Sequence, residues 1–334
     1  MSILGLSAQF GESGTPECRA RHAPGGPGSS CAAPGLVVAI DWSGRARGEQ
    51  RYLWTAEARC DRLLRLGDGR RRAEVEDHLV SLAGAEPRLV VGIDFSFSLP
   101  GWWMRQQGFS DPAELWRAAA EWGERWLQEC RPPFWGRPSR KRPLVDDPRR
   151  PPLRLTEQLT PPVAGLRPKS TFQVGGAGAP GTGSIRGMPM LARLRRAGFA
   201  IWPFDPPHWP VALEIWPRQL TGPVRKSDPA ARRRYLEALA RARPGGLESP
   251  ELFALATSSE DALDAAVAAL ALGSGLRSLD DLPTSLPPEA GLEGWIWAPP
   301  PDGVTLAAGG GEHTNRSATR VARAARRPPS GRSS

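Results

Sequence analysis

The sequence predicts an α/β protein in which a mixed sheet is flanked by helices. Two apolar runs, LVVAIDWSG (36–44) and RLVVGIDFS (88–96), lack polar alternation and are typical of strands buried on both faces. A helical pattern over 71–84 separates them, which predicts a right-handed strand–helix–strand unit with parallel strands. Strands come early in the chain and alternate with helices later, as in α/β domains.

The remaining elements follow the same alternation. Two further strands are expected after the first one, RYLWTAEA (51–58) and RLLRLG (62–67). Asp111 as N-cap and Pro112 in the first helical position predict a helix over 111–130. After it we expect, in order, a helix over 188–198, strands over 199–204 and 211–217, helices beginning near Pro229 and Pro250, a last helix over 258–273 and an edge strand over 293–299.

One folded domain is expected over 36–305, interrupted by a long irregular insertion at 131–169. The insertion holds ten prolines and ten Lys or Arg residues against three acids, and loops of this length are usually functional or disordered. Residues 1–35 are rich in Gly, Pro, Ser and Ala, and we expect a disordered N-terminal extension. Residues 306–334 are expected to form a disordered basic tail, either a solvated extension or a phosphate-binding segment.

The formal net charge of +9 is a weak indicator of a nucleic-acid partner, because six arginines and no acid follow position 315. Without those six, 38 basic residues stand against 35 acids, a net charge of +3. We see no apolar run of the ~18 residues that span a membrane, and no pattern of a secretory signal. We therefore expect a cytoplasmic protein with no membrane association and no obligate protein partner. Its four cysteines lack C-x-x-C spacing and are expected to be free thiols.

Two nearly identical segments, VVAIDWS and VVGIDFS, each run an apolar strand into an aspartate. If these strands are parallel neighbours, Asp41 and Asp94 end them at the edge where α/β sheets collect ligands, with side chains roughly 5 Å apart. Carboxylates that close repel each other unless a cation compensates them. The alternative for each aspartate is a cap on the following turn. The match between the two segments favours a shared site.

Three more acids are candidates for the same site. Glu214 interrupts an apolar strand, where an unpaired charge would be costly, so it either serves the site or pairs with Arg218 or Arg225. Asp261 lies in the first turn of the last helix, where an acid also suits the helix dipole. Asp264 lies on the same face three residues later, and the alanines around it allow the helix to pack closely on the sheet.

These carboxylates form an oxygen-ligand set suited to Mg²⁺ or Mn²⁺, with Asp41, Asp94, Glu214 and Asp264 as ligands and Asp261 beside them. Two such ions roughly 4 Å apart activate water and stabilise the leaving oxygen of a phosphodiester. This chemistry requires no histidine or serine nucleophile, and no such nucleophile is apparent in the sequence. The expected activity is metal-dependent hydrolysis of nucleic acid, either DNA or RNA.

The order of these motifs resembles the ribonuclease H-like fold. Within that fold, the chain resembles the predicted RNase H-like nuclease family catalogued as domain of unknown function number 429. The motifs VVAIDWSG, VVGIDFSFSLP, GGAGAPGTGSIRGMP, LEIWPRQLTG and EDALDAAVAAL carry the resemblance, which covers about 36–273. It implies that the strands ending at Asp41 and Asp94 are adjacent and parallel, and that the protein is a nuclease. The long basic insertion and both tails depart from the family's compact pattern.

A glycine-rich stretch, VGGAGAPGTGSIRGMP (174–189), leads into the helix expected from Met188 and lacks the G-K-[ST] ending of a P-loop. Backbone amides at a helix N-terminus bind anions, so we expect a substrate phosphate here; the alternative is a flexible linker. The expected substrate-binding residues are Ser43, Gly176, Gly178, Thr182, Ser184, Arg186 and, as a second phosphate contact, Lys226.

Other interpretations stay open at this point. Trp102 and Trp103 follow the second aspartate motif closely and either stack on unpaired bases or pack in the core. An ATP-dependent phosphotransferase of the sugar-kinase or actin-like type would use similar aspartates and glycine-rich loops, although it usually has two duplicated domains. A protein that binds nucleic acid without cleaving it would need no metal.

Overall fold

The structure is a computed structural model that describes residues 34–138, 140–142, 147–176 and 178–300. The predictions of disorder for 1–35 and 306–334 therefore lie outside the described residues, except at positions 34 and 35. No helix within the described ranges is long and apolar enough to cross a membrane.

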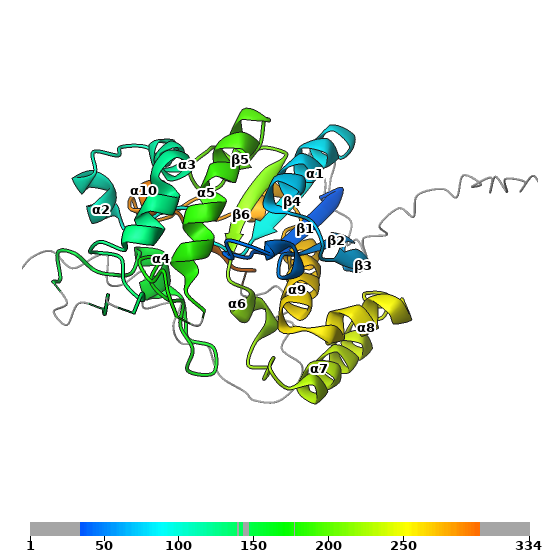
Figure 1. The fold of residues 1–334 in the computed structure, drawn as a ribbon. Coiled ribbons are helices and arrows are strands. Elements are labelled where there is room, and N and C mark those ends of the chain that lie inside the picture. The colour runs from blue at the N-terminus through cyan, green and yellow to red at the C-terminus, as the bar shows by residue number, and fades with distance from the viewer. Residues whose placement is uncertain (1–33, 139, 143–146, 177, 301–334) are drawn as a thin grey trace, which may run out of the picture.

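One mixed sheet organises the molecule, in the strand order β3-β2-β1-β4-β6-β5 (Figure 1). The first three strands form an antiparallel meander, and β4 and β6 then extend the sheet in parallel to β1. Strand β6 pairs with β5 along its first half and with β7 along its second. The strands are β1 (Leu36–Asp41), β2 (Trp54–Arg59), β3 (Arg62–Gly67), β4 (Leu89–Ile93), β5 (Ala200–Ile201), β6 (Val211–Ile215) and β7 (Ile296–Trp297).

This order, with its antiparallel first pair, confirms the predicted α/β class and is consistent with a ribonuclease H-like fold. The parallel pairing of β1 with β4 aligns Ile40 with Ile93, as the two similar segments predicted. The predicted strand at 293–299 is confirmed as the short strand β7.

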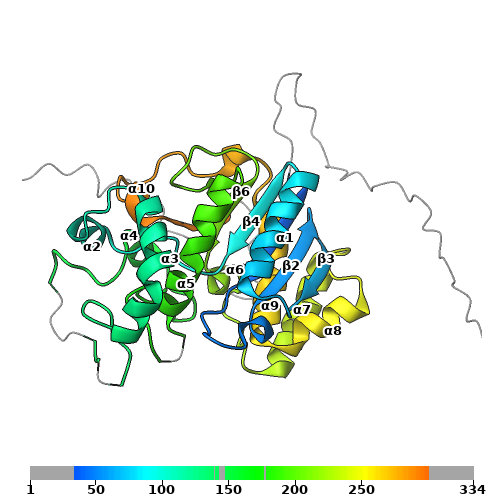
Figure 2. The same ribbon diagram turned by 45° about the horizontal axis from the view of Figure 1, so that its top comes forward.

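Helices cover both faces of the sheet, and the residues of β1 divide between them. Val37 and Ala39 face a core shared with α9, while Val38 and Ile40 face a core shared with α1, α3 and α5 (Figure 2). The helices are α1 (Arg72–Ala85), α2 (Gly101–Gln106), α3 (Pro112–Glu129), α4 (Leu155–Leu159), α5 (Pro180–Arg196), α6 (Pro217–Thr221), α7 (Pro229–Ala242), α8 (Pro250–Ser258), α9 (Glu260–Gly275) and α10 (Ala290–Glu293).

Two local predictions need correction. Helix α5 begins at Pro180, eight residues before the expected start, so more than half of the glycine-rich stretch is helical. Proline at the first position suits a helix start, and the glycines that follow allow close packing, since a Cβ on Gly187 would lie 2.5 Å from Phe95. The prediction of free thiols holds for the buried Cys130 and is wrong for Cys60, which is disulfide-bonded.

Candidate active site

The site is built on the carboxyl ends of two adjacent parallel strands. Asp41 is the last residue of β1, and Asp94 directly follows β4. The backbone N–H of Asp94 donates to the carbonyl of Ile40 at 3.0 Å, which extends the β1–β4 ladder to the aspartates. A side-chain hydrogen bond also joins the two carboxyl groups. The pair predicted from the two matching segments therefore meets in space.

Helix α9 brings two further acids to this edge. Asp261 and Asp264 lie in its first two turns, and Ser259 caps the helix by accepting a hydrogen bond from the backbone N–H of Ala262 at 2.9 Å. The helix lies close to the sheet because its facing residues are small. At the crossing with β4 a Cβ on Gly92 would lie 2.4 Å from the side chain of Leu272, so a larger residue would force that side chain to move.

These four carboxyl groups influence one another's protonation. Burial, followed by the charges of Asp94 and Asp264, raises the pKa of Asp41 well above its usual range. Burial and the charge of Asp264 raise the pKa of Asp94 to about 7, although the charge of Lys226 and, less strongly, the hydrogen bond from Asp41 oppose this rise. Burial also raises the pKa of Asp261 and of Asp264. The cluster carries more negative charge than its surroundings compensate.

Lys226 supplies a positive charge inside this cluster. Its Nζ lies 2.6 Å from Oδ1 of Asp264 and also contacts Oδ2, and only 6% of the residue is exposed. The buried Arg232 fixes this segment, because its guanidinium donates to the carbonyls of Lys226, Thr257 and Ser258. One arginine thus ties the lysine to the end of α8, directly before the helix that carries Asp264. Lys226 is a carboxylate partner here, which the sequence did not predict.

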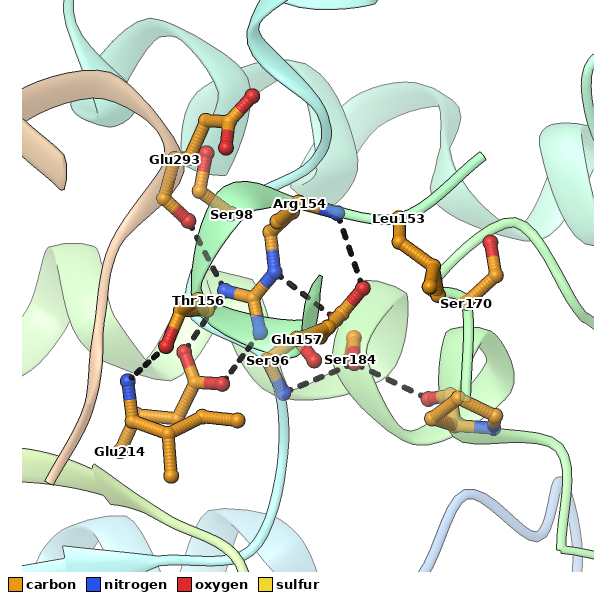
Figure 3. Close-up of polar contacts among 12 residues, drawn as sticks. Ser96, Ser98, Leu153, Arg154, Thr156, Glu157, Ser170, Ser184, Glu214 and Glu293 are labelled. Atoms are coloured by element: carbon orange, nitrogen blue, oxygen red, sulfur yellow. Dashed lines mark hydrogen bonds and ion pairs between the residues drawn. The ribbon is translucent and has the colours of Figure 1, made fainter. Parts of the chain in front are cut away.

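Glu214 has a different environment from the one expected for a metal ligand. It is buried in β6, and both of its oxygens accept hydrogen bonds from Arg154, one of them at 2.9 Å (Figure 3). The backbone N–H of Phe97 donates to the same carboxylate at 2.9 Å. Neither Arg218 nor Arg225 is its partner. We therefore leave Glu214 out of the candidate metal shell, although its charge still contributes to the raised pKa of Asp94.

Arg154 is the centre of a buried ionic network. It is fully buried and also donates through Nε to Glu157 at 3.0 Å and through Nη1 to the carbonyl of Glu293 at 2.9 Å (Figure 3). One cation therefore serves two carboxylates. Burial raises the pKa of Glu157 to about 7 even with the guanidinium beside it. This arginine joins the basic insertion to the sheet, and nothing in the local sequence marked it.

A cleft of about 590 Å³ opens beside the carboxylates, within the range of ligand-binding pockets. Asp94, Asp264 and Lys226 line one part of it. The first residues of α5 line another part, and the insertion contributes the exposed Arg167 and Lys169 to the wall. The cleft therefore combines an acidic cluster with a helix N-terminus and two basic side chains, a combination that can accommodate an anion next to a bound cation.

The structure brings two of the seven predicted substrate-binding residues to the cleft. Gly178 and Lys226 line the cleft, whereas Ser43, Gly176, Thr182, Ser184 and Arg186 do not. The Thr182 hydroxyl donates to the carbonyl of Val174 at 2.9 Å, which holds the glycine-rich segment against the helix.

Two of the predicted donors have internal partners instead. Ser184 is buried and accepts from the backbone N–H of Ser96 at 3.0 Å. Arg186 forms a two-point ion pair with Glu124 of α3, at 2.6 and 2.8 Å, and is not directed at the cleft. The glycine-rich segment would therefore contact an anion through its backbone rather than through these side chains.

Within the described residues, no three or more His, Cys, Asp or Glu side chains stand in a ready-made arrangement for a metal ion. The donor set nevertheless fits Mg²⁺ or Mn²⁺, because Asp41, Asp94 and Asp264 offer hard oxygen ligands whose mutual repulsion a divalent cation would relieve. Binding would require small side-chain movements, among them at Asp264, which holds Lys226.

Comparison of the chain with protein-family models, with curated proteins and with solved structures finds no match.

Proposed function

We propose that this protein is a divalent-metal-dependent phosphodiesterase that hydrolyses nucleic acid. The observation that carries the proposal is the meeting of Asp41, Asp94 and Asp264, from two adjacent parallel strands and a helix, beside a cleft that Asp94 and Asp264 line and that also has a basic wall. Hard carboxylate oxygens from separate elements suit Mg²⁺ or Mn²⁺. The motif order, which resembles the predicted RNase H-like nuclease family, supports the same function, and the strand order is consistent with that fold.

The residues divide into three roles in this proposal. Asp41, Asp94 and Asp264 would hold the metal, and Asp261 completes the shell or orients water, since Glu214 is bound to Arg154. A bound divalent ion would supply an activated water and balance the charge of the leaving oxygen.

Lys226 and the opposite wall of the cleft would hold the substrate. The ammonium of Lys226 adds a positive charge next to Asp264, which favours a phosphate group at that end of the cleft. The backbone amides at the start of α5, with Arg167 and Lys169 nearby, favour a second phosphate of the same strand.

The test is hydrolysis of labelled single-stranded, duplex and branched DNA and RNA in Mg²⁺ or Mn²⁺. Wild type should cleave at least one of them, and Asp41→Asn and Asp94→Asn should each lower the rate by at least about 100-fold. Asp61→Asn changes an exposed aspartate in the β2–β3 turn, at the opposite edge of the sheet, and should leave the rate unchanged. Cleavage that persists in both site variants would reject the proposed site.

Binding measurements separate the proposal from the two other functions considered. Stabilisation by ATP in the absence of any hydrolysis of nucleic acid would favour a phosphotransferase. Nucleic-acid binding that neither Mg²⁺ nor Asp94→Asn alters would favour a protein that binds without cleaving.

A further inference from the structure

A second cavity, with four aromatic rings in its walls, lies between helix α2 and the basic insertion. Its volume is about 310 Å³, and its walls include Trp102, Trp103, Trp135 and Phe172. The ring of Phe172 is fully buried, and its centroid lies 5.7 to 6.5 Å from those of the three tryptophans. The indole N–H of Trp102 donates to the carbonyl of Pro151 at 2.8 Å, which fixes the orientation of that ring. The walls are therefore rigid and aromatic.

Two arginines of the insertion lie over these rings. Arg150 is 5.7 Å from the ring centroid of Trp102, and Arg142 is 5.9 Å from that of Trp135. Both distances are near the ~6 Å limit of a cation–π contact. Arg150 is exposed, so its guanidinium can move to admit a flat group. Asp147 is the one acid among the described lining residues, and its Oδ1 accepts from the backbone N–H of Arg149 at 2.9 Å. The pocket thus favours a planar aromatic group that carries a negative charge.

We propose that this pocket binds one unpaired nucleobase of a nucleic-acid strand. Unpaired bases stack on tryptophan and phenylalanine rings and on guanidinium planes, and their phosphates pair with arginine. A cavity of about 310 Å³ lies at the lower end of the range for ligand pockets, so it admits a single flat group and excludes a stacked base pair. The identity of the ligand rests on the proposed function. If a base binds here, the substrate of the proposed nuclease is nucleic acid with an unpaired segment.

The same two segments, 152–157 and 169–172, contribute walls to both the pocket and the cleft, so one strand can occupy both. Lys169 lines the cleft and Phe172 lines the pocket, and three residues of backbone span at most ~10 Å. Likewise Glu157 lines the cleft and Pro152 lines the pocket. The hydroxyl of Ser170 donates to the carbonyl of Pro152, which ties the two segments of this wall together. A base held in the pocket therefore lies within a few nucleotides of the carboxylate cluster.

The test is the affinity of a fluorescent single-stranded oligonucleotide of about ten nucleotides, measured by anisotropy in EDTA on the Asp94→Asn background, where no cleavage interferes. Arg150→Ala should weaken binding about fivefold or more, because it removes a stacking plane. Arg149→Ala is the matched control: it removes the same charge from the neighbouring residue, whose side chain is 93% exposed and does not line the pocket. Its Nε lies 3.8 Å from Oδ1 of Asp147, and an exposed ion pair at this distance contributes little. It should have little effect.

Two further ligands separate stacking from simple charge attraction. An oligonucleotide of abasic sites should bind more weakly than the normal strand, and Arg150→Ala and Arg149→Ala should bind it with equal affinity. The two variants should also bind a duplex with equal affinity. The inference is overturned if both variants weaken binding of the single strand equally, or if the duplex binds more tightly than the single strand. It is also overturned if a proline-rich peptide occupies the pocket and the oligonucleotide does not. This assay needs neither metal nor hydrolysis. Its result therefore tests base binding in the pocket separately from the proposed nuclease activity, and either one can be disproved while the other holds.

Discussion

The ammonium of Lys226 lies 2.6 Å from a carboxylate oxygen of Asp264, inside a cluster of four acidic side chains that come from two strands and a helix. The ion pair is almost fully buried, with 7% and 14% of the two side chains exposed. A buried pair of this kind is costly to break from one side, because the remaining charge stays desolvated. The lysine is therefore the residue on which the stability of the metal-free site depends most directly.

Replacing Lys226 with methionine, which has a similar length and no charge, should destabilise the metal-free protein at pH 8 by about 2–4 kcal/mol, because Asp264 loses its cation. Adding Asp264→Asn to that variant should recover much of the loss, since it removes the unpaired charge. Urea unfolding of the two single variants and the double variant measures the coupling. Lys141→Met, at an exposed lysine, is the control, and an equal loss in this control would contradict the prediction.

Asp94 should make the metal-free protein less stable as pH rises. Its pKa is raised to about 7, above the unfolded value of about 3.9, so the folded state binds more protons between these two values. The contribution of the protonated group is complete below pH 4 and is lost as pH rises through 7. Asp94→Asn removes this dependence and should stabilise the metal-free protein at pH 8 by about 2 kcal/mol.

The measurement for Asp94 is the difference in unfolding free energy between the variant and wild type from pH 4 to 8. The difference should grow with pH, and Mg²⁺ should raise the melting temperature of wild type at pH 8 more than that of the variant. A difference that shrinks with rising pH would show that the carboxylate form is favoured in the fold.

The ionic network around Arg154 should be important for folding rather than for metal binding. Arg154→Met leaves Glu214 and Glu157 buried without a cation and should cost about 3–5 kcal/mol. Glu157→Gln should cost less than about 1 kcal/mol at pH 7, since this group is already partly protonated there and an amide oxygen can still accept from the guanidinium. Denaturant unfolding of both variants measures the two losses of stability. An unchanged unfolding free energy in Arg154→Met would contradict the prediction.

A methyl group at Gly92 should push helix α9 away from the sheet. The new Cβ would lie 2.4 Å from a methyl of Leu272 and 3.2 Å from Ile215, so we expect a loss of about 1–3 kcal/mol. Because α9 carries Asp264, stabilisation by Mn²⁺ in a thermal-shift measurement should weaken as well. Gly291→Ala is the control, since a Cβ there would meet nothing within 4 Å. Unchanged stability and Mn²⁺ response in Gly92→Ala would exclude a tight α9–β4 contact.

The sequence by itself determined the sheet and the position of the strand-end acids. Strand periodicity and N-caps are local signals, and two matching segments favoured a shared site for Asp41 and Asp94 at the ends of neighbouring strands. The aligned β1–β4 pair confirms that the strands are neighbours. The small residues around Asp264 likewise predicted that its helix lies close to the sheet, because the packing distance depends on side-chain size.

Only the tertiary structure decided which charges pair and which surfaces form cavities. Arg154 lies 60 residues from Glu214, and Lys226 lies 38 residues from Asp264, so no local pattern distinguishes these partners from other arginines and lysines. The early start of α5 turned Arg186 towards Glu124, where a loop would have left it free. The irregular insertion gained its aromatic pocket only by packing against α2. Side-chain partners across such distances depend on how the elements dock, and docking is settled by the whole core rather than by any one segment.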